Sequence, residues 1–463
     1  MDSAHRNRVL ILLFMGVFMG SLDIGIVGPA LPAIQSFFGV DERLISWIFS
    51  IYILFFMIGT PIMAKLSDIY GRRTIYVLDV AIFALGSLIT ILSSSFWMIL
   101  LGRAVQGFGA GGIFPVASAF IGDTFPPDKR GGALGIIGSV WGLSGILGPI
   151  IGALLLNYAW EWLFIINLPI AALVIALSYL ILPATKKLEK ISFDWAGTIL
   201  LALLVTSLAL GVNQIDTSNF LASLSSLMVW PFLILALIFL LLLVRTERTA
   251  PDPVVQIGLY HSREVKVATS IAIGTGLSQT AIVFMPSLAV AALSLSTSQA
   301  SLMVIPLVLA LGISAPVIGR LLDRYGTRII MIGGTLLLAG GLFLLSTLAS
   351  SFYLFILSGI IIGLGLGTVI GSPLRYIMLT ETPPPQRASG QALINFNSSA
   401  GQLVGGTLIG AVIASQGGGL AGYSSAYLLI AGIAIIMFLL TLNLKRRKEQ
   451  LATMFKSNQE DRE

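Results

Sequence analysis

Long apolar runs alternate with short polar loops from residue 9 to residue 443. Each run approaches the roughly 20 residues that an α-helix needs to cross about 30 Å of hydrocarbon. The expected spans are 9–33, 44–66, 74–93, 96–120, 134–156, 163–183, 195–213, 227–245, 267–293, 299–322, 329–349, 352–374, 390–414 and 423–443. The pattern predicts an all-α polytopic membrane protein with 14 transmembrane helices.

Two charged loops of similar sequence interrupt this pattern. The first, at 64–73, reads AKLSDIYGRR, and the second, at 319–328, reads GRLLDRYGTR. An offset of 255 residues relates Asp68 to Asp323, Tyr70 to Tyr325, Gly71 to Gly326 and Arg73 to Arg328. The segments 126–130 and 383–387 repeat at an offset of 257. Repeats of this kind in a membrane chain predict a transporter built from two related halves.

The repeat and two polar linkers define the expected domains. Residues 1–183 form an N-terminal six-helix bundle and residues 267–443 a C-terminal one. Residues 184–266 form a linker region that carries two additional helices, at about 195–213 and 227–245. Residues 444–463 form a tail.

Composition and charge fit a membrane protein. The chain is 56% hydrophobic and 10% charged, against about 25% charged in a soluble domain. It has no Cys and two His, which argues against disulfides, thiol chemistry and a metal centre. Of the 27 Lys and Arg, 25 fall on one set of loops and the tail, while Arg43 lies on the other side and Arg103 within a span.

The positive-inside rule makes the charge-rich face cytoplasmic, with both termini on it, in the cell membrane. The net charge of +6 therefore reflects topology and does not indicate nucleic-acid binding. The first apolar run continues past Leu31 with no small-residue cleavage site, so we interpret it as a retained spanning helix.

Several motifs make the chain resemble the major facilitator superfamily, and within it the fourteen-helix drug:proton antiporter family. The motifs are the loop at 64–73, LGRAVQG at 101–107, GILGPIIG at 145–152, the segment 22–32, WEWLFIINLP at 160–169 and FDWAG at 193–197. The resemblance implies two six-helix bundles plus two extra helices, and alternating access coupled to protons. Departures at Ala64, Ile69, Gly25, Gly28 and Glu161 leave the substrate and the details of coupling open.

Asp23 is the strongest candidate for proton coupling. It lies 14 residues into the first expected span, about 21 Å from its start. An ionised carboxylate in a bilayer costs roughly 2.5–3.5 kcal/mol, which favours uptake of a proton. Arg103 is expected at nearly the same depth, with Gln106 one turn further on. We expect these three residues to form a coupling network; the alternatives are a structural clamp or a hydrated Asp23 near the outer surface.

Two further groups have expected roles in conformational change. The resemblance implies that the paired loops act as a latch, formed by Asp68, Gly71, Arg72, Arg73, Asp323, Gly326 and Arg328. Their alternative role is a positively charged anchor. In the fifth span, Gly135, Gly138, Gly142, Gly145, Gly148 and Gly152 recur on one side of the helix, where close approach is possible, and Pro149 is expected to bend it. The resemblance implies that Gly145, Gly148, Pro149 and Gly152 form an antiporter motif that limits proton leak.

Other polar groups are less informative. Asp79 lies only one and a half turns into the third span, so it is expected to reach the interface and has no assigned role. Gln279, Asn395, Asn397 and Gln402 either line a cavity or bond across helices. The glycine-rich segment 107–112 lies inside a span and is not expected to bind phosphate.

The sequence thus predicts a proton-coupled efflux antiporter that exports amphipathic or cationic small molecules. It is expected to be a monomer in the lipid bilayer, without enzymatic activity, cofactor or metal. One alternative is a dedicated exporter of an endogenous lipid or metabolite. A second is a non-transporting membrane receptor or scaffold.

Overall fold

The computed structural model describes residues 3–183, 194–251, 253–370, 372–382 and 387–450, which contain helices and loops but no strand. The first half contains α1 (Ser3–Phe38), α2 (Glu42–Ile45), α3 (Trp47–Tyr70), α4 (Arg72–Ile91), α5 (Phe96–Thr124), α6 (Pro127–Leu155), α7 (Trp162–Ile165) and α8 (Asn167–Ile181). The middle contains α9 (Trp195–Asn213), α10 (Phe220–Leu224), α11 (Trp230–Glu247) and the 3₁₀-helix η1 (Ile257–His261). The second half contains α12 (Arg263–Leu293), α13 (Thr297–Leu302), α14 (Ile305–Tyr325), α15 (Thr327–Leu348), α16 (Phe352–Ile370), α17 (Ser372–Glu381), α18 (Arg387–Ser415) and α19 (Gly419–Thr441).

The predicted number of spans is confirmed within these residues. The structure contains 14 helical segments that are long and apolar enough to cross a membrane. Several exceed the expected lengths, because helix continues through polar residues at the span ends. The first helix, for example, begins at Ser3 rather than at residue 9 and has 36 residues.

Local signals at the helix ends explain where the chain turns. Ser95 and Asp194 accept hydrogen bonds from the backbone N–H groups of Met98 and Gly197, at 3.4 and 2.7 Å, and so cap α5 and α9. The two repeated loops turn at Gly71 and Gly326, whose φ angles are 93° and 78°. These angles lie in the region that favours glycine, so both turns depend on it.

The two halves pack their helices in corresponding ways. In the first half α4 packs on α5, α3 on α5 and α1 on α6. The equivalent helices of the second half, α15 on α16, α14 on α16 and α12 on α18, make the same pairs. The additional helices α9 and α11 pack on each other, and α9 also contacts α3 and α18.

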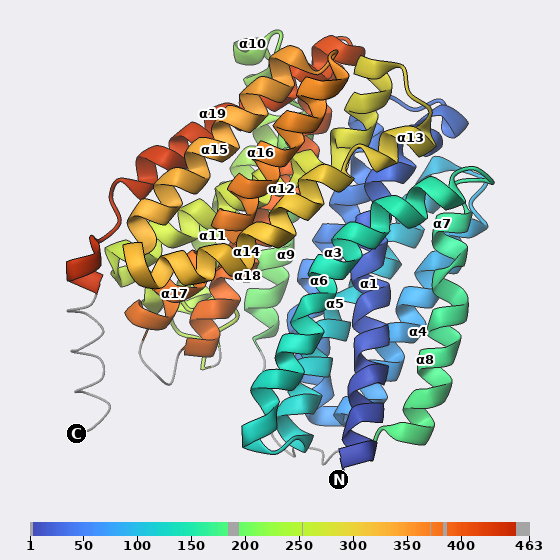
Figure 1. Cartoon of the computed structure of the whole chain (residues 1–463), viewed down its shortest axis with the longest axis vertical. Helices are drawn as coiled ribbons and strands as arrows, with labels where there is room; N and C mark the ends of the chain where they lie inside the picture. Colours follow the sequence, from blue (N-terminus) through green and yellow to red (C-terminus); the bar gives the residue numbers. More distant parts are fainter. Residues whose placement is uncertain (1–2, 184–193, 252, 371, 383–386, 451–463) are drawn as a thin grey trace.

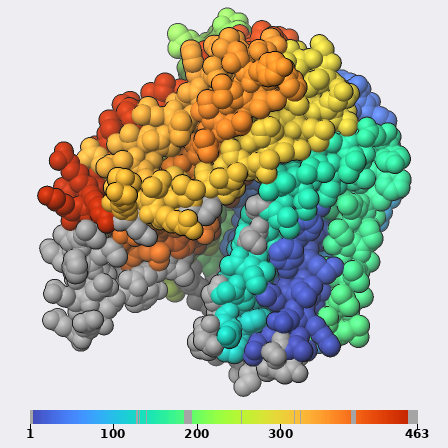
Figure 2. Space-filling model, viewed as in Figure 1, coloured from blue at the N-terminus to red at the C-terminus, as the bar shows by residue number. Residues whose placement is uncertain are grey.

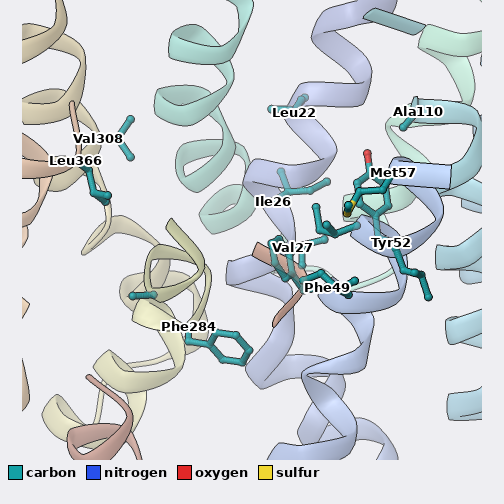
Figure 3. Packing of buried hydrophobic residues seen from close by; sticks show 14 of the residues in the cluster. Leu22, Ile26, Val27, Phe49, Tyr52, Met57, Ala110, Phe284, Val308 and Leu366 are labelled. Carbon is teal, nitrogen blue, oxygen red and sulfur yellow. The ribbon is translucent and has the colours of Figure 1, made fainter. Parts of the chain in front are cut away.

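The halves meet at the end of the molecule opposite to the first turn of α1, which we call the far end (Figure 1). Figure 1 shows the halves converging there, while their other ends, which we call the termini end, stand apart. The space-filling view shows the same separation at the termini end (Figure 2). At the far end the Ser298 hydroxyl donates to the Ala153 carbonyl at 2.7 Å. Phe284 of α12 points toward Val27 and Phe49 in the first half (Figure 3). The seam between the halves is therefore closed at the far end by apolar contacts and a hydrogen bond.

Glycine permits the closest of these helix contacts. A Cβ on Gly28 would lie 2.6 Å from the Val283 carbonyl oxygen across the seam, and one on Gly148 would lie 2.8 Å from the Gly25 carbonyl carbon. Gly135 and Gly138 of the same predicted row have nothing within 4 Å of an added Cβ and are exposed. The expectation of close approach along the whole glycine row is therefore wrong at these two positions, because they lie nearer the termini end.

These contacts predict different effects of two alanine substitutions on the same helix. Gly148→Ala is expected to lower the free energy of unfolding by about 1–3 kcal/mol, because the new methyl overlaps the α1 backbone. Gly135→Ala is the matched control and is expected to change it little. Thermal melting of the two purified variants in detergent measures the difference, and equal melting temperatures would contradict the packing described here.

Candidate functional site

The structure brings the three candidate coupling residues together in the interior of the first half. Asp23 of α1 and Arg103 and Gln106 of α5 are all fully buried. The Arg103 Nη1 atom lies 2.6 Å from Asp23 Oδ2 and also donates to the Gln106 side-chain oxygen. Gln106 in turn donates from Nε2 to Asp23 Oδ1 at 2.8 Å.

Two further residues, which the sequence did not predict to be part of it, complete this network. Asn167, the first residue of α8, donates from Nδ2 to Asp23 Oδ1 at 3.2 Å. Ser87 of α4 accepts from Gln106 at 2.8 Å and from Asn167 at 3.3 Å. The polar Asn167 at the start of an apolar span was the available signal. The network therefore joins α1, α4, α5 and α8.

Arg103 is also held from the side of α3. Its Nε donates to the Ile48 carbonyl at 3.3 Å, and the centre of its guanidinium lies 4.2 Å from the centroid of the Tyr52 ring. The Phe164 ring centroid is 5.7 Å away. Such cation–π contacts stabilise a desolvated arginine by about 2 kcal/mol. The Nη2 atom has no hydrogen-bond partner among the described residues.

The geometry provides the ionised carboxylate with compensating partners. Asp23 accepts three hydrogen bonds from N–H donors, one of them from a cation. Arginine keeps its charge at any relevant pH. A proton that binds Asp23 would therefore leave a buried, uncompensated arginine, which is unfavourable unless the helices rearrange. The site can thus convert a change of protonation into a change of packing.

A small apolar pocket lies next to the network. It lies between α1, α3, α5 and α6 and is lined by Val17, Gly20, Ser21, Ile24, Phe56, Ala110, Ile113, Phe114 and Trp141. The volume open to the centre of a water-sized molecule is about 10 Å³, enough for about one water molecule, so a drug-sized molecule fits only if these helices move apart. Tyr52 connects the pocket to the network, because its hydroxyl donates to the Gly20 carbonyl at 3.5 Å and its ring stacks on Phe56.

The predicted latch residues of the first half also lie together, at the termini end. Arg72 forms ion pairs with Asp68 and, at 2.9 Å, with Asp123 of α5. Its Nη1 also donates to the Ser67 hydroxyl at 2.6 Å. Arg73 instead donates to the Leu182 carbonyl at 3.2 Å, so it ties α4 to the end of α8.

The latch loop of the second half has different partners. Thr327, which replaces Arg72 in the repeat, hydrogen bonds to Gln450 of the C-terminal segment through both its backbone N–H and its hydroxyl. A Cβ on Gly326 would lie 3.0 Å from the Arg447 side chain. Arg328 is half-buried on α15. The Asp323 side chain lies outside the described residues.

The antiporter-motif residues follow the far half of α6. A Cβ on Gly145 would lie 3.0 Å from the Val308 side chain of α14, across the seam, and one on Gly152 would lie 2.9 Å from Pro29 of α1. Pro149 lies inside the helix between them. This part of α6 therefore packs on α1 and approaches the second half.

In the second half, three of the predicted polar residues bond across helices. Gln279 of α12 donates to the Ser398 hydroxyl of α18 at 3.3 Å and accepts from Gln402 at 3.4 Å. Asn397 donates to the Tyr260 hydroxyl at 3.1 Å. These neutral pairs contrast with the ionic network of the first half.

Comparison with known proteins identifies the family. The chain matches the Major Facilitator Superfamily over residues 13–260 and 267–460. It therefore belongs to the major facilitator superfamily, whose members are membrane transporters and not enzymes. Its helical architecture and 14 candidate spans agree with that assignment.

Several curated relatives cover most of the chain. It is similar to the uncharacterized MFS-type transporter YfiU of Bacillus subtilis, with 32% identity over 88% of this chain and 80% of the relative. Multidrug resistance protein 3 of Bacillus subtilis is 29% identical over the same shares of the two chains. Riboflavin transporter RibZ of Clostridioides difficile is 30% identical over 83% of each chain.

The buried ion pair predicts a specific pattern of stability. Asp23→Asn is expected to lower the free energy of unfolding by about 3–5 kcal/mol, because it leaves Arg103 buried without its counter-ion. The double variant Asp23→Asn/Arg103→Gln is expected to recover part of that loss. Melting temperatures of the two single variants and the double variant give the coupling energy.

Asp41→Asn is the control for this comparison. Asp41 is exposed and caps α2 through Oδ1, a bond that the asparagine oxygen can keep. The Asp41→Asn variant is expected to have the melting temperature of the wild type. Purely additive effects at positions 23 and 103 would show that the pair does not stabilise the fold as described.

Proposed function

We propose that this transporter is a proton-coupled efflux antiporter of the multidrug type. It exports amphipathic or cationic small molecules and takes up protons in exchange. The observation that carries this proposal is the fully buried network of Asp23, Arg103, Gln106 and Asn167. The similarity to Multidrug resistance protein 3 supports the substrate class.

In the proposed mechanism, Asp23 is the group that binds the proton. Protonation removes its charge and weakens the bond to Arg103 Nη1, while Arg103 stays charged. Gln106 and Asn167 carry both donors and acceptors, so either side chain can rotate to accept from a neutral carboxyl. The four helices that share the network then prefer a different packing, which is the conformational step of exchange.

The substrate acts on this network through Tyr52 and not by direct contact. Asp23 is fully buried, so a substrate group that widens the adjacent pocket meets Phe56 and Ser21 but not the carboxylate. Phe56 stacks on Tyr52, and the Tyr52 ring lies on Arg103. The aromatic lining, including Phe114 and Trp141, suits a planar apolar group on the substrate.

We further propose that the termini lie in the cytoplasm and that the structure represents an inward-facing arrangement. The positive-inside rule supports the orientation, and the separation of the halves at the termini end supports the arrangement (Figure 2). Arg72, Asp68 and Asp123 then form the first-half part of a cytoplasmic latch. It would engage the second half when that side closes. The proposed unit is a monomer in the cell membrane.

A dedicated exporter of one metabolite is the second candidate function. The similarity to RibZ, which is named as a riboflavin transporter, favours it. An efflux assay across a panel of unrelated compounds, with and without a protonophore, separates the two. Export of several compounds supports the multidrug type, export of one supports the dedicated type, and absence of flux would favour a receptor or scaffold.

The proton role of Asp23 is tested with ethidium, an amphipathic cation, in proteoliposomes. Wild-type protein is expected to drive ethidium against its gradient when a pH gradient is imposed. Asp23→Asn is expected to lose this driven transport but to keep exchange of ethidium at equal pH, because the pocket remains. Asp41→Asn is expected to behave like the wild type. Full driven transport by Asp23→Asn would remove Asp23 from the coupling role.

A further inference from the structure

A second buried carboxyl in the first half belongs to none of the groups described above. Asp79 of α4 lies about 10 Å along the helix from Arg72 and is fully buried. The expectation that it reaches the interface is therefore wrong. The reason is the tight packing of α5: a Cβ on Gly112 would overlap the Asp79 carboxyl group.

Asp79 has no compensating partner in the part of the chain that the structure describes. Neither of its carboxyl oxygens has a hydrogen bond there, and no ion pair includes it. Tyr76, one turn away, donates its hydroxyl to the Leu13 carbonyl of α1 at 3.2 Å. Nothing comparable to the three donors around Asp23 surrounds this carboxyl.

The charged groups of the neighbouring helices are directed elsewhere. On α5, Arg103 bonds to Asp23 and Asp123 bonds to Arg72. On α4 itself, Arg73 donates to the Leu182 carbonyl. Of the other helices packed on α4, α3 carries the titratable groups Tyr52, Lys65, Asp68 and Tyr70, α8 carries only Tyr179, and α7 has none. The helix α1, which Tyr76 reaches, carries Asp23 and, near its start, His5, Arg6 and Arg8.

We propose that Asp79 is a second proton-binding site of the first half and carries a proton in this arrangement. An ionised carboxylate buried without donors is far more unfavourable than a neutral carboxyl, which is only an unsatisfied polar group. Both carboxyl oxygens are buried from solvent, so no water shell stabilises the charge in this arrangement. The neutral acid is therefore the form that this environment accepts.

The position of Asp79 along α4 suggests how the proton is released. Arg72, Asp79 and Ser87 are spaced by about two turns each, so they fall on one side of the helix, facing α5. Arg72 bonds to Asp123 of α5 at one end and Ser87 bonds to Gln106 of α5 at the other. Asp79 lies between these two hydrogen-bonded pairs in the same α4–α5 interface.

Phe83 is fully buried between the levels of Asp79 and Ser87. A Cβ on Gly109 of α5 would lie 2.6 Å from its backbone nitrogen, so the interface is tight there as well. The two carboxyls therefore bind protons separately and do not exchange them directly. A shift of α5 against α4 that breaks the Arg72–Asp123 pair would admit water to Asp79 from the termini end and allow its proton to leave. The use of this proton in antiport rests on the proposed function.

Infrared difference spectroscopy tests the protonation directly and needs no substrate. Wild-type protein, Asp79→Asn and Asp23→Asn are compared in lipid vesicles near neutral pH, in H₂O and in D₂O. One carboxylic-acid C=O component of the wild-type spectrum is expected to be absent from Asp79→Asn and present in Asp23→Asn. Such a band unchanged by Asp79→Asn would overturn the proposal, and so would the absence of any Asp79-dependent band in the wild type.

Asp79→Ala provides a second measurement if the asparagine variant gives too little protein. Alanine is neutral and smaller than aspartate, so it adds no overlap with Gly112 and is expected to melt within a few degrees of the wild type. A strong loss of stability in Asp79→Ala would mean that an ionised Asp79 has a partner, which contradicts the proposal. Asp41→Ala, at the exposed cap, is the control for the general effect of the substitution.

The role in antiport has its own readout. The number of protons taken up per ethidium exported is expected to be lower in Asp79→Asn than in the wild type. If the wild type shows the Asp79 band but exchanges no protons for ethidium, the proposed function fails while the proton-binding assignment stands. If Asp79→Asn keeps the wild-type ratio of protons to ethidium, Asp79 is excluded from the exchange.

Discussion

The Asp23–Arg103 ion pair is the interaction on which the rest of the first half depends. Two charges that are fully buried in an apolar helix bundle are each unfavourable alone, and only their contact makes them tolerable. Asn167 and Ser87 extend this requirement to α8 and α4, so four helices must keep one register. When a proton breaks the Asp23–Arg103 ion pair, the packing of these four helices changes. Protonation is thereby coupled to a change of conformation.

Close packing by small residues makes such a network possible. Glycines of α5 let α4 and α3 approach until backbone meets backbone, and water is thereby excluded from the polar groups between them. The α4–α5 interface contains three polar levels, at Arg72–Asp123, at Asp79 and at Ser87–Gln106. The outer two are satisfied by partners, and the middle one is not. The same packing that stabilises the charged pair thus leaves Asp79 suited to a neutral acid.

The apolar runs were enough to predict the helical class and the number of spans, because 20 apolar residues have few other structures available to them. Similar depth in the membrane was enough to predict that Asp23 meets Arg103. Hydropathy does not give the rotation of a helix, so it could not show that Asn167 and Ser87 face the same point. The prediction that Asp79 reaches the interface was made from its distance to the helix end. It was wrong because close packing against Gly112 of α5 buries the side chain. Sequence spacing likewise could not show that Gly135 is exposed while Gly148 is packed.

In the proposed mechanism, a substrate and a proton act on one buried network although they do not occupy one site. The decisive measurement is the release of protons when a ligand binds. Ethidium is added to purified protein in a weakly buffered detergent solution, and the pH is followed with an indicator dye. Proton release is expected from the wild type and not from Tyr52→Ala, because the path from the pocket to Arg103 passes through that ring. Equal proton release by both proteins, at saturating ethidium, would disprove the proposed coupling through Tyr52.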